Sequence, residues 1–274
     1  MQVHRKTLLF TIAMILVLFM TSPAKPEQQS MSIPADQPLP VLNVYCDVQL
    51  VPVVEDFAIK MRQQNIIDLH LSSDTSDNLL IYLQDKPELA DIILTEGKDS
   101  ILLGNKLGIL SANDVISIAS DRLVAVAAKG RDISSPVSYI SKVKKGRIVI
   151  ADPNKNIVGL HADQALKRIG LGKAVDGKLR HTKNDQLAAI EVEKGNADIA
   201  IVYQSTMFQN TAVYSIMTMP KNSYLPIIYF GSPLSHLVGA KKNVAEAILS
   251  KLAGPESKDI WMKYGFSPPP KNTP

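Results

Sequence analysis

The sequence predicts an α/β fold with two lobes. Short apolar strands alternate with amphipathic helical segments, which is typical of largely parallel sheets flanked by helices. The strands fall into two clusters, at about residues 41–94 and 123–203. A last strand and helix follow residue 215, and two crossings between the lobes would return them to the first cluster.

The composition is that of a globular protein. Of the 274 residues, 46% are hydrophobic and 20% are charged, which excludes wholesale disorder, a coiled coil and a fibre. The net charge is only +4 and aromatic residues make up 5%. A dedicated nucleic-acid binder normally shows a strong basic patch, so we expect no nucleic-acid partner.

Residues 1–24 are predicted to be a cleaved signal peptide. Arg5 and Lys6 precede an uncharged run over residues 8–20, which has the length of a signal-peptide core and is shorter than a membrane span. Small residues precede a cleavage site after Ala24; an uncleaved anchor is the alternative. We therefore expect a periplasmic protein. Residues 25–40, rich in Pro, Gln and Ser, indicate a flexible leader.

Each expected element of the first lobe has a local reason. Pro52 suits the first turn of a helix, and apolar residues continue from it at helical spacing. Ser72, Ser73, Asp74 and Thr75 can all cap the next helix. The expected elements are strands 41–45, 66–71 and 90–94, a helix from Pro52, and a helix over 78–83.

The elements expected in the second lobe also have local sequence signals. Gly170 is expected to end one helix, and Asn184 or Asp185 to cap the next, which Gly195 closes. The expected elements there are strands 123–128, 147–150 and 198–203, and helices 159–169 and 184–194.

The return segment is predicted to hold a strand over 224–229 and a helix over 244–252. Pro226 favours an edge position for that strand. We therefore divide the chain into a signal peptide (1–24), a leader (25–40), lobe 1 (41–120), lobe 2 (121–214), the return to lobe 1 (215–266) and a flexible tail (267–274).

Four segments carry a family resemblance. They are GRIVIADP at 146–153, followed by Gly159; AIEVEKGNADIAIVY at 189–203; ADIIL at 90–94; and WMKYGF at 261–266. In this order and spacing they resemble the molybdate-binding proteins of ABC transporters, within the type II periplasmic-binding-protein-like fold. The resemblance covers about residues 41–266.

The resemblance implies a substrate-binding protein that holds molybdate or tungstate between two lobes and delivers it to a membrane ABC permease. It implies neither a cofactor nor an enzymatic activity, and we expect a monomer. The alternatives are the same fold binding a cation or an amine-bearing solute, and an adhesin or sensor that reuses the fold.

Position by position, the resemblance places ligand contacts at six residues. Ser73, with Ser72 beside it, falls on the family's second serine, although either could instead cap a helix. Tyr203 falls on the ligand tyrosine, or is a packing residue, and Val158 falls on a position that contributes a backbone N–H. Gln49 replaces the family's first serine, and Asp185 replaces the other backbone contact.

The acidic residues bear directly on the ligand. An inward carboxylate about 4 Å from a dianion would cost about 8 kcal/mol at an effective dielectric constant of about 20. We expect Asp74 and Asp185 to cap helices and turn their charges away, whereas Asp47 has no obvious capping role. The three could instead hold a cation or an amine, or approach the metal atom of the oxyanion.

The remaining reactive residues point to no second site. The histidines lack metal-ligand spacing, so we expect scattered surface or packing residues and no metal site. Cys46 is expected to be a small buried residue. Lys142, Lys144, Lys145 and Arg147 form a basic run that is either a solvated loop or a docking patch for a partner.

Overall fold

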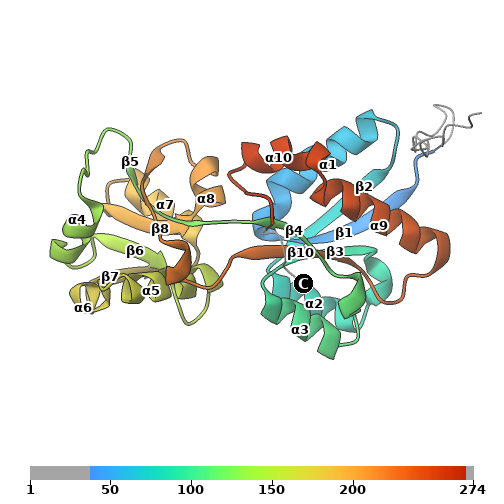
Figure 1. Ribbon diagram of the computed structural model, residues 1–274, viewed down its shortest axis with the longest axis horizontal. Helices are drawn as coiled ribbons and strands as arrows, with labels where there is room; N and C mark the ends of the chain where they lie inside the picture. Colours follow the sequence, from blue (N-terminus) through green and yellow to red (C-terminus); the bar gives the residue numbers. More distant parts are fainter. Residues whose placement is uncertain (1–37, 270–274) are drawn as a thin grey trace, which may run out of the picture. The chain divides into compact units, whose positions relative to one another are not determined.

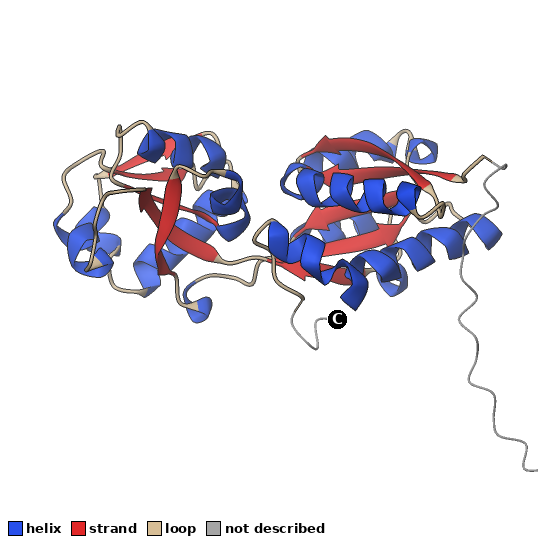
Figure 2. Ribbon diagram, turned by 90° about the horizontal axis from the view of Figure 1, so that it is seen from above, coloured by secondary structure: helices blue, strands red, loops and turns tan. Residues whose placement is uncertain are grey.

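The computed structural model describes residues 38–269, all within one unit, Ile33–Pro274 (Figure 1). The predicted signal peptide, most of the leader and the end of the tail lie outside the described residues. No helix within 38–269 combines the length and hydropathy that a membrane crossing requires. Two five-stranded sheets, each surrounded by helices, form the predicted two-lobed α/β architecture (Figure 2).

The first sheet has the order β2-β1-β3-β10-β4. Its strands are β2 (Asp68–Asp74), β1 (Val41–Asp47), β3 (Ile92–Glu96), β10 (Ile228–Pro233) and β4 (Ile116–Ser120). β1 pairs in parallel with β2 and β3, whereas β10 is antiparallel to both of its neighbours. Every strand except β10 therefore runs in the same direction.

The second sheet repeats this plan in the order β7-β6-β8-β5-β9. Its strands are β7 (Leu179–Thr182), β6 (Ile148–Ala151), β8 (Ile199–Tyr203), β5 (Leu123–Ala128) and β9 (Val213–Thr218). β5 is the one antiparallel strand, next to β8 and β9. The reversed strands, β5 and β10, are those that the chain enters on crossing from one sheet to the other.

Helices connect the strands in both lobes. They are α1 (Val51–Gln63), α2 (Ser76–Gln84), α3 (Lys98–Lys106), α4 (Pro136–Lys142), α5 (Ile157–Arg168), α6 (Gly172–Val175), α7 (Asp185–Glu193), α8 (Gln204–Gln209), α9 (Gly239–Ala253) and α10 (Lys258–Lys263). Short 3-10 turns are η1 (Val48–Leu50), η2 (Pro87–Leu89), η3 (Ala112–Asp114), η4 (Lys221–Ser223) and η5 (Pro255–Ser257).

The return to lobe 1 differs from the prediction. β9 pairs with β5, so the second lobe extends to Thr218 and the boundary predicted at 214/215 falls inside a strand. The strand expected over 224–229 at an edge is β10, which begins at Ile228 and lies between β3 and β4. Pro226 precedes β10, so it removes no hydrogen bond from the sheet.

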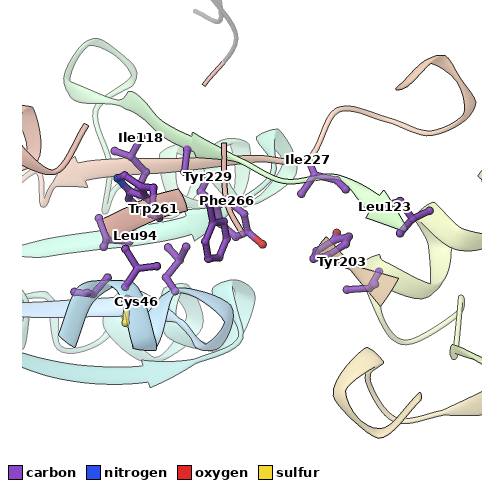
Figure 3. Close-up of a cluster of buried hydrophobic side chains, with 14 of the residues drawn as sticks. Cys46, Leu94, Ile118, Leu123, Tyr203, Ile227, Tyr229, Trp261 and Phe266 are labelled. Carbon is purple, nitrogen blue, oxygen red and sulfur yellow. The ribbon is translucent and has the colours of Figure 1, made fainter. Parts of the chain in front are cut away.

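A buried aromatic group closes the first lobe at the C-terminal end of the described chain. Phe266 makes edge-to-face contacts with Tyr229 and Trp261, each at 5.4 Å between ring centroids (Figure 3). Trp261 also donates from Nε1 to the carbonyl of Leu252 at 2.8 Å. These contacts fix α10 against α9 and β10.

Candidate functional site

The candidate site lies where parallel strands of both sheets end. Asp47 ends β1, Glu96 ends β3 and Tyr203 ends β8, and all three are buried. Ligands in open α/β sheets bind beyond the carboxyl ends of the strands, so this edge is the candidate site. Figure 3 shows Tyr203 at its position in the second lobe.

Asp47 organises the part of the site that belongs to the first lobe. Its Oδ1 accepts from the backbone N–H of Gln49 at 3.0 Å, which caps η1. Its Oδ2 accepts from both the hydroxyl (2.6 Å) and the N–H (3.0 Å) of Ser76, at the start of α2. Ser76 Oγ in turn accepts from the N–H of Glu96 at 2.8 Å. Asp47 therefore has the capping role that the sequence did not reveal.

Asp185 organises the part in the second lobe. Asn184 is the N-cap of α7, accepting from Leu187 N at 2.9 Å, so Asp185 is the first helical residue. The Asp185 carboxylate is fully buried, and its Oδ2 accepts from Tyr203 N at 3.1 Å and from Thr206 Oγ1 at 2.7 Å. The expectation that Asp185 caps a helix and turns its charge away was wrong, because Asn184 takes the cap and Asp185 points inward.

Gln49 joins the two lobes. Its Nε2 donates to Asp185 Oδ1 at 3.1 Å, and its Oε1 accepts from Gln186 Nε2 at 3.0 Å. Gln49, at the position of the family's first serine, thus uses both its amide nitrogen and its amide oxygen in hydrogen bonds to α7. The predicted pair Gln49 and Asp185 therefore lies together.

Tyr203 forms a second polar connection between the lobes. Its side chain is fully buried, and its hydroxyl donates to Glu96 Oε1 at 2.5 Å. His161 Nδ1, on α5, lies 2.8 Å from the same hydroxyl. Burial lowers the pKa of His161 to about 4, so this imidazole is neutral at neutral pH and can donate from Nδ1.

Four buried carboxyl groups with raised pKa values gather at the site. Burial raises the pKa of Asp47 and Asp185, and raises that of Asp121, in the first crossing, to about 7. Burial, followed by the charge of Asp47, raises the pKa of Glu96 well above its ordinary value. Within residues 38–269, none of the four accepts a hydrogen bond from a lysine or arginine side chain. The four carboxyl groups therefore have only neutral side chains and backbone N–H groups as hydrogen-bond donors.

The other predicted ligand residues lie differently. Ser72 and Ser73 are exposed in β2, because β2 continues to Asp74 in parallel pairing with β1. The alternative that they cap a helix was wrong, whereas their role as ligand contacts stays a prediction. Asp74 is the exposed last residue of β2 and accepts from Asn78 Nδ2 at 3.1 Å. The N-cap of α2 is Thr75, so the expectation that Asp74 caps a helix was wrong. The N–H of Val158 donates to Asn156 Oδ1 at 2.9 Å, within the N-cap of its own helix.

The sequence did not identify several residues of the site. They are Ser76, Glu96, Asp121, His161, Gln186 and Thr206. One usable signal was present, since Glu96 is an acid placed directly at the end of an apolar strand. Ser76 was obscured by the run of hydroxyl and acidic residues before it.

The remaining candidates lie elsewhere or are inert. Burial raises the pKa of the Cys46 thiol to about 12, consistent with a buried packing residue. No group of three or more potential metal ligands gathers within residues 38–269. Two cavities of about 670 and 690 Å³ lie in the second lobe, and none of the candidate site residues lines either of them.

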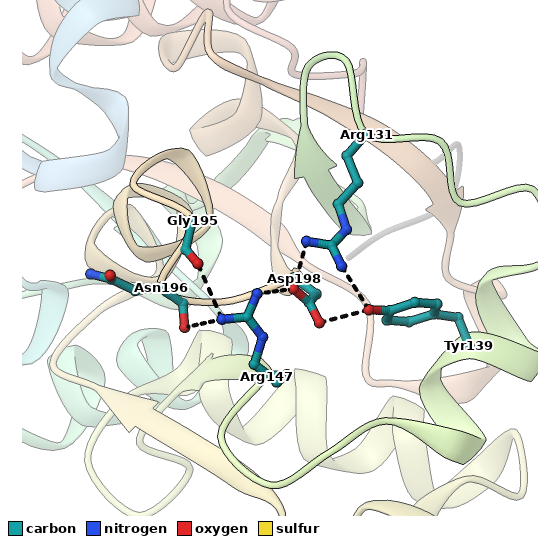
Figure 4. A network of polar contacts seen from close by, with 6 residues as sticks. All are labelled: Arg131, Tyr139, Arg147, Gly195, Asn196 and Asp198. Carbon is teal, nitrogen blue, oxygen red and sulfur yellow. Dashed lines mark hydrogen bonds and ion pairs between the residues drawn. The ribbon is translucent and has the colours of Figure 1, made fainter.

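The basic run is partly structural. Arg147 and Arg131 both pair with the buried carboxylate of Asp198, and Tyr139 donates its hydroxyl to Asp198 Oδ2 at 2.6 Å (Figure 4). Arg147 also donates to the carbonyls of Gly195 and Asn196, at 3.1 and 3.0 Å (Figure 4). These contacts stabilise the start of β6 and β8, at the strand ends opposite the candidate site.

The chain is similar to known molybdate-binding proteins in both sequence and structure. The molybdate-binding protein ModA of Escherichia coli (strain K12) is 23% identical over 231 residues, which cover 82% of this chain and 88% of the relative. The periplasmic molybdate-binding protein of Azotobacter vinelandii has a TM-score of 0.68 at 20% identity, covering 84% of this chain and 100% of that chain.

A substrate-binding domain assigned to a molybdenum ABC transporter from Clostridium difficile has a TM-score of 0.76 at 17% identity, covering 84% of this chain and 99% of that chain. These structures share the fold. The model of the bacterial extracellular solute-binding protein family matches residues 42–267, which include both lobes and every residue of the candidate site. The chain therefore belongs to the family of bacterial extracellular solute-binding proteins.

Proposed function

We propose that this protein captures a small oxyanion of the molybdate and tungstate class between its lobes and delivers it to an ABC permease. The observation that carries the proposal is the convergence of both lobes on Tyr203, at the carboxyl ends of β1, β3 and β8. The ligand class is supported by the curated relative from Escherichia coli, which is named for binding molybdate. The family binds solutes, in agreement with the expectation that the chain is not an enzyme.

Capture would follow from the division of contacts between the lobes. The first lobe supplies Gln49 and the second supplies Tyr203 and the N-terminal turn of α7. A ligand that contacts both lobes binds the closed arrangement better than an open one, so it shifts the population towards closure. No resident cofactor is needed for this binding cycle.

A periplasmic location is part of the proposal. It rests on the family, whose members are extracellular, and on the signal peptide predicted at residues 1–24. Within this proposal the processed chain is a monomer that encounters its permease at the membrane.

A second candidate is a cation or an amine-bearing solute. The observation that favours it is the set of four buried carboxyl groups, Asp47, Glu96, Asp121 and Asp185, from both lobes and the first crossing. Such a ligand would supply the positively charged donor that no lysine or arginine side chain within residues 38–269 provides to them.

A thermal-shift panel separates the two candidates, because a ligand that binds only the folded state raises its melting temperature. The processed protein is heated with molybdate, tungstate, sulfate, divalent cations and small amines, each at several concentrations. Stabilisation by molybdate and tungstate alone supports the oxyanion. Stabilisation only by cations or amines would overturn it in favour of the second candidate.

A further inference from the structure

We propose that oxyanion capture is coupled to the uptake of one proton by Glu96, which frees the hydroxyl of Tyr203 to donate to the ligand. This inference rests on the proposed function, since it concerns the same site. It also accounts for how a dianion is accepted among buried carboxyl groups.

The geometry sets up a competition for one proton. The Tyr203 hydroxyl carries a single hydrogen, which it donates to Glu96 Oε1 at 2.5 Å. An ionised carboxylate can only accept hydrogen bonds, so it competes with an oxyanion for that hydrogen. A protonated Glu96 has its own O–H donor, and the Tyr203 hydroxyl is then released. His161 Nδ1, at 2.8 Å, keeps the phenol in place from the other side.

The surroundings of Glu96 favour its neutral form. The titratable groups that face it are Asp47 on β1, Asp121 after β4, Asp185 on α7, Tyr203 on β8 and Tyr229 on β10, with His161 on α5 behind Tyr203. Arg122, which follows Asp121 in the chain, donates from its guanidinium to Ser267 Oγ at 3.3 Å. Burial and these acids raise the pKa of Glu96, and a bound dianion would raise it further.

The second lobe acts on the pKa of Glu96 in two opposite directions. The hydrogen bond from Tyr203 lowers it, and the charge of Asp185 raises it. When the Tyr203 hydroxyl donates to a bound dianion instead, the lowering contact is lost and the charge of the ligand is added, so the pKa of Glu96 rises on binding. The ligand-bound state then binds more protons than the ligand-free state, so binding is favoured below the raised pKa and is weakened as the pH rises through it.

Tyr229 provides an independent indication that the site can accept a further hydrogen-bonding group. Its hydroxyl is fully buried and has no hydrogen-bond partner within residues 38–269. Tyr229 pairs with Glu96 across β10 and β3, and it lies on the side of the first lobe towards Tyr203 (Figure 3). An unpaired buried phenol is costly, so a ligand oxygen or the protonated Glu96 would satisfy it.

The proton balance gives a direct measurement. One proton leaves the solvent for each dianion bound, so the affinity should rise about tenfold for each unit that the pH falls between the ligand-bound and ligand-free pKa values of Glu96. Calorimetric titration of the processed protein with molybdate, at one pH in buffers of different ionisation enthalpy, counts that proton. We expect about one proton per molybdate at a pH between these two pKa values.

Two matched variants assign the proton. Glu96→Gln keeps the shape of the side chain and cannot titrate, so we expect its proton uptake to fall by about one proton per molybdate relative to the unaltered protein. Glu88→Gln removes an exposed carboxylate from η2 of the same lobe and should leave the uptake unchanged.

The outcomes separate the inference from the function on which it rests. Molybdate binding by the unaltered protein without proton uptake overturns the inference and leaves the proposed function intact. Absence of binding to molybdate and tungstate across the whole pH range overturns both. The proton count on the unaltered protein decides the question even if Glu96→Gln does not fold.

Discussion

Replacing Tyr203 by Phe tests the centre of the site with the smallest possible change. The substitution removes one oxygen from a fully buried ring and retains the ring itself. The lost hydroxyl donates to Glu96 at 2.5 Å and lies 2.8 Å from His161 Nδ1. Both partners remain buried and lose a hydrogen bond.

The magnitude follows from these two contacts. A hydrogen bond to a charged group contributes about 1.5–3 kcal/mol and one between neutral groups about 0.5–1.5 kcal/mol. Tyr203→Phe should therefore lower the free energy of unfolding by about 2–4 kcal/mol. If the hydroxyl also donates to the oxyanion, the affinity should fall by about 1–3 kcal/mol, or roughly 5- to 150-fold.

Urea denaturation and calorimetric titration with molybdate measure the two quantities separately. Tyr214→Phe is the control, because it also removes one phenolic hydroxyl, which donates to the carbonyl of Arg131 at 2.7 Å in the second lobe. The control should lose about 1 kcal/mol of stability and bind molybdate normally. Unchanged molybdate affinity in Tyr203→Phe would refute its assignment as a ligand.

Three further predictions concern the support of the site. Asp185→Ala should lower the free energy of unfolding by about 2–5 kcal/mol, because Tyr203 N–H and Thr206 lose their acceptor; wild-type stability in urea would contradict this. Gly159→Ala should destabilise by about 1–3 kcal/mol or more, because its Cβ would lie 2.3 Å from the carbonyl oxygen of Ala151; an unchanged melting temperature would show that α5 can shift. Burial raises the pKa of Asp198, but hydrogen bonds from Arg147 and Tyr139 outweigh it and the net pKa is lowered. The stability from Asp198 is therefore present above its unfolded pKa of about 4 and lost below it, so Asp198→Asn should lose less stability than the wild type between about pH 5 and 3; equal acid losses would contradict this.

Much of the fold could be predicted from local sequence signals. β5 spans Leu123–Ala128 as predicted, because five of its six residues are buried and form a continuous apolar run. α7 follows Asn184, whose side chain makes the expected cap. Strands β4, β7 and β9 were missed, because they contain partly buried residues and short runs without a clear apolar pattern.

The position of β10 could not be derived from the sequence. Whether a strand lies at an edge depends on tertiary pairing, and Pro226 turned out to precede the strand. Within the strand, Gly231 allows α9 to approach, since a Cβ there would lie 2.6 Å from Leu249 Cδ2.

Of the residues predicted as ligand contacts, Gln49, Asp185 and Tyr203 lie together, whereas Ser72 and Ser73 are exposed. Parallel pairing of β1 with β2 continues through the two serines to Asp74, so the buried hydroxyl is that of Ser76. Long-range register decides which serine faces the site, and local propensity does not contain that information.

Calorimetric titration of residues 25–274 with molybdate, tungstate and sulfate over a range of pH is the most direct test of the central claim. The account predicts one-to-one binding of molybdate and tungstate, discrimination against sulfate, and uptake of about one proton per ligand. A folded sample that binds none of the three, but binds a divalent cation or an amine, would contradict it and assign the four carboxyl groups to a cationic ligand.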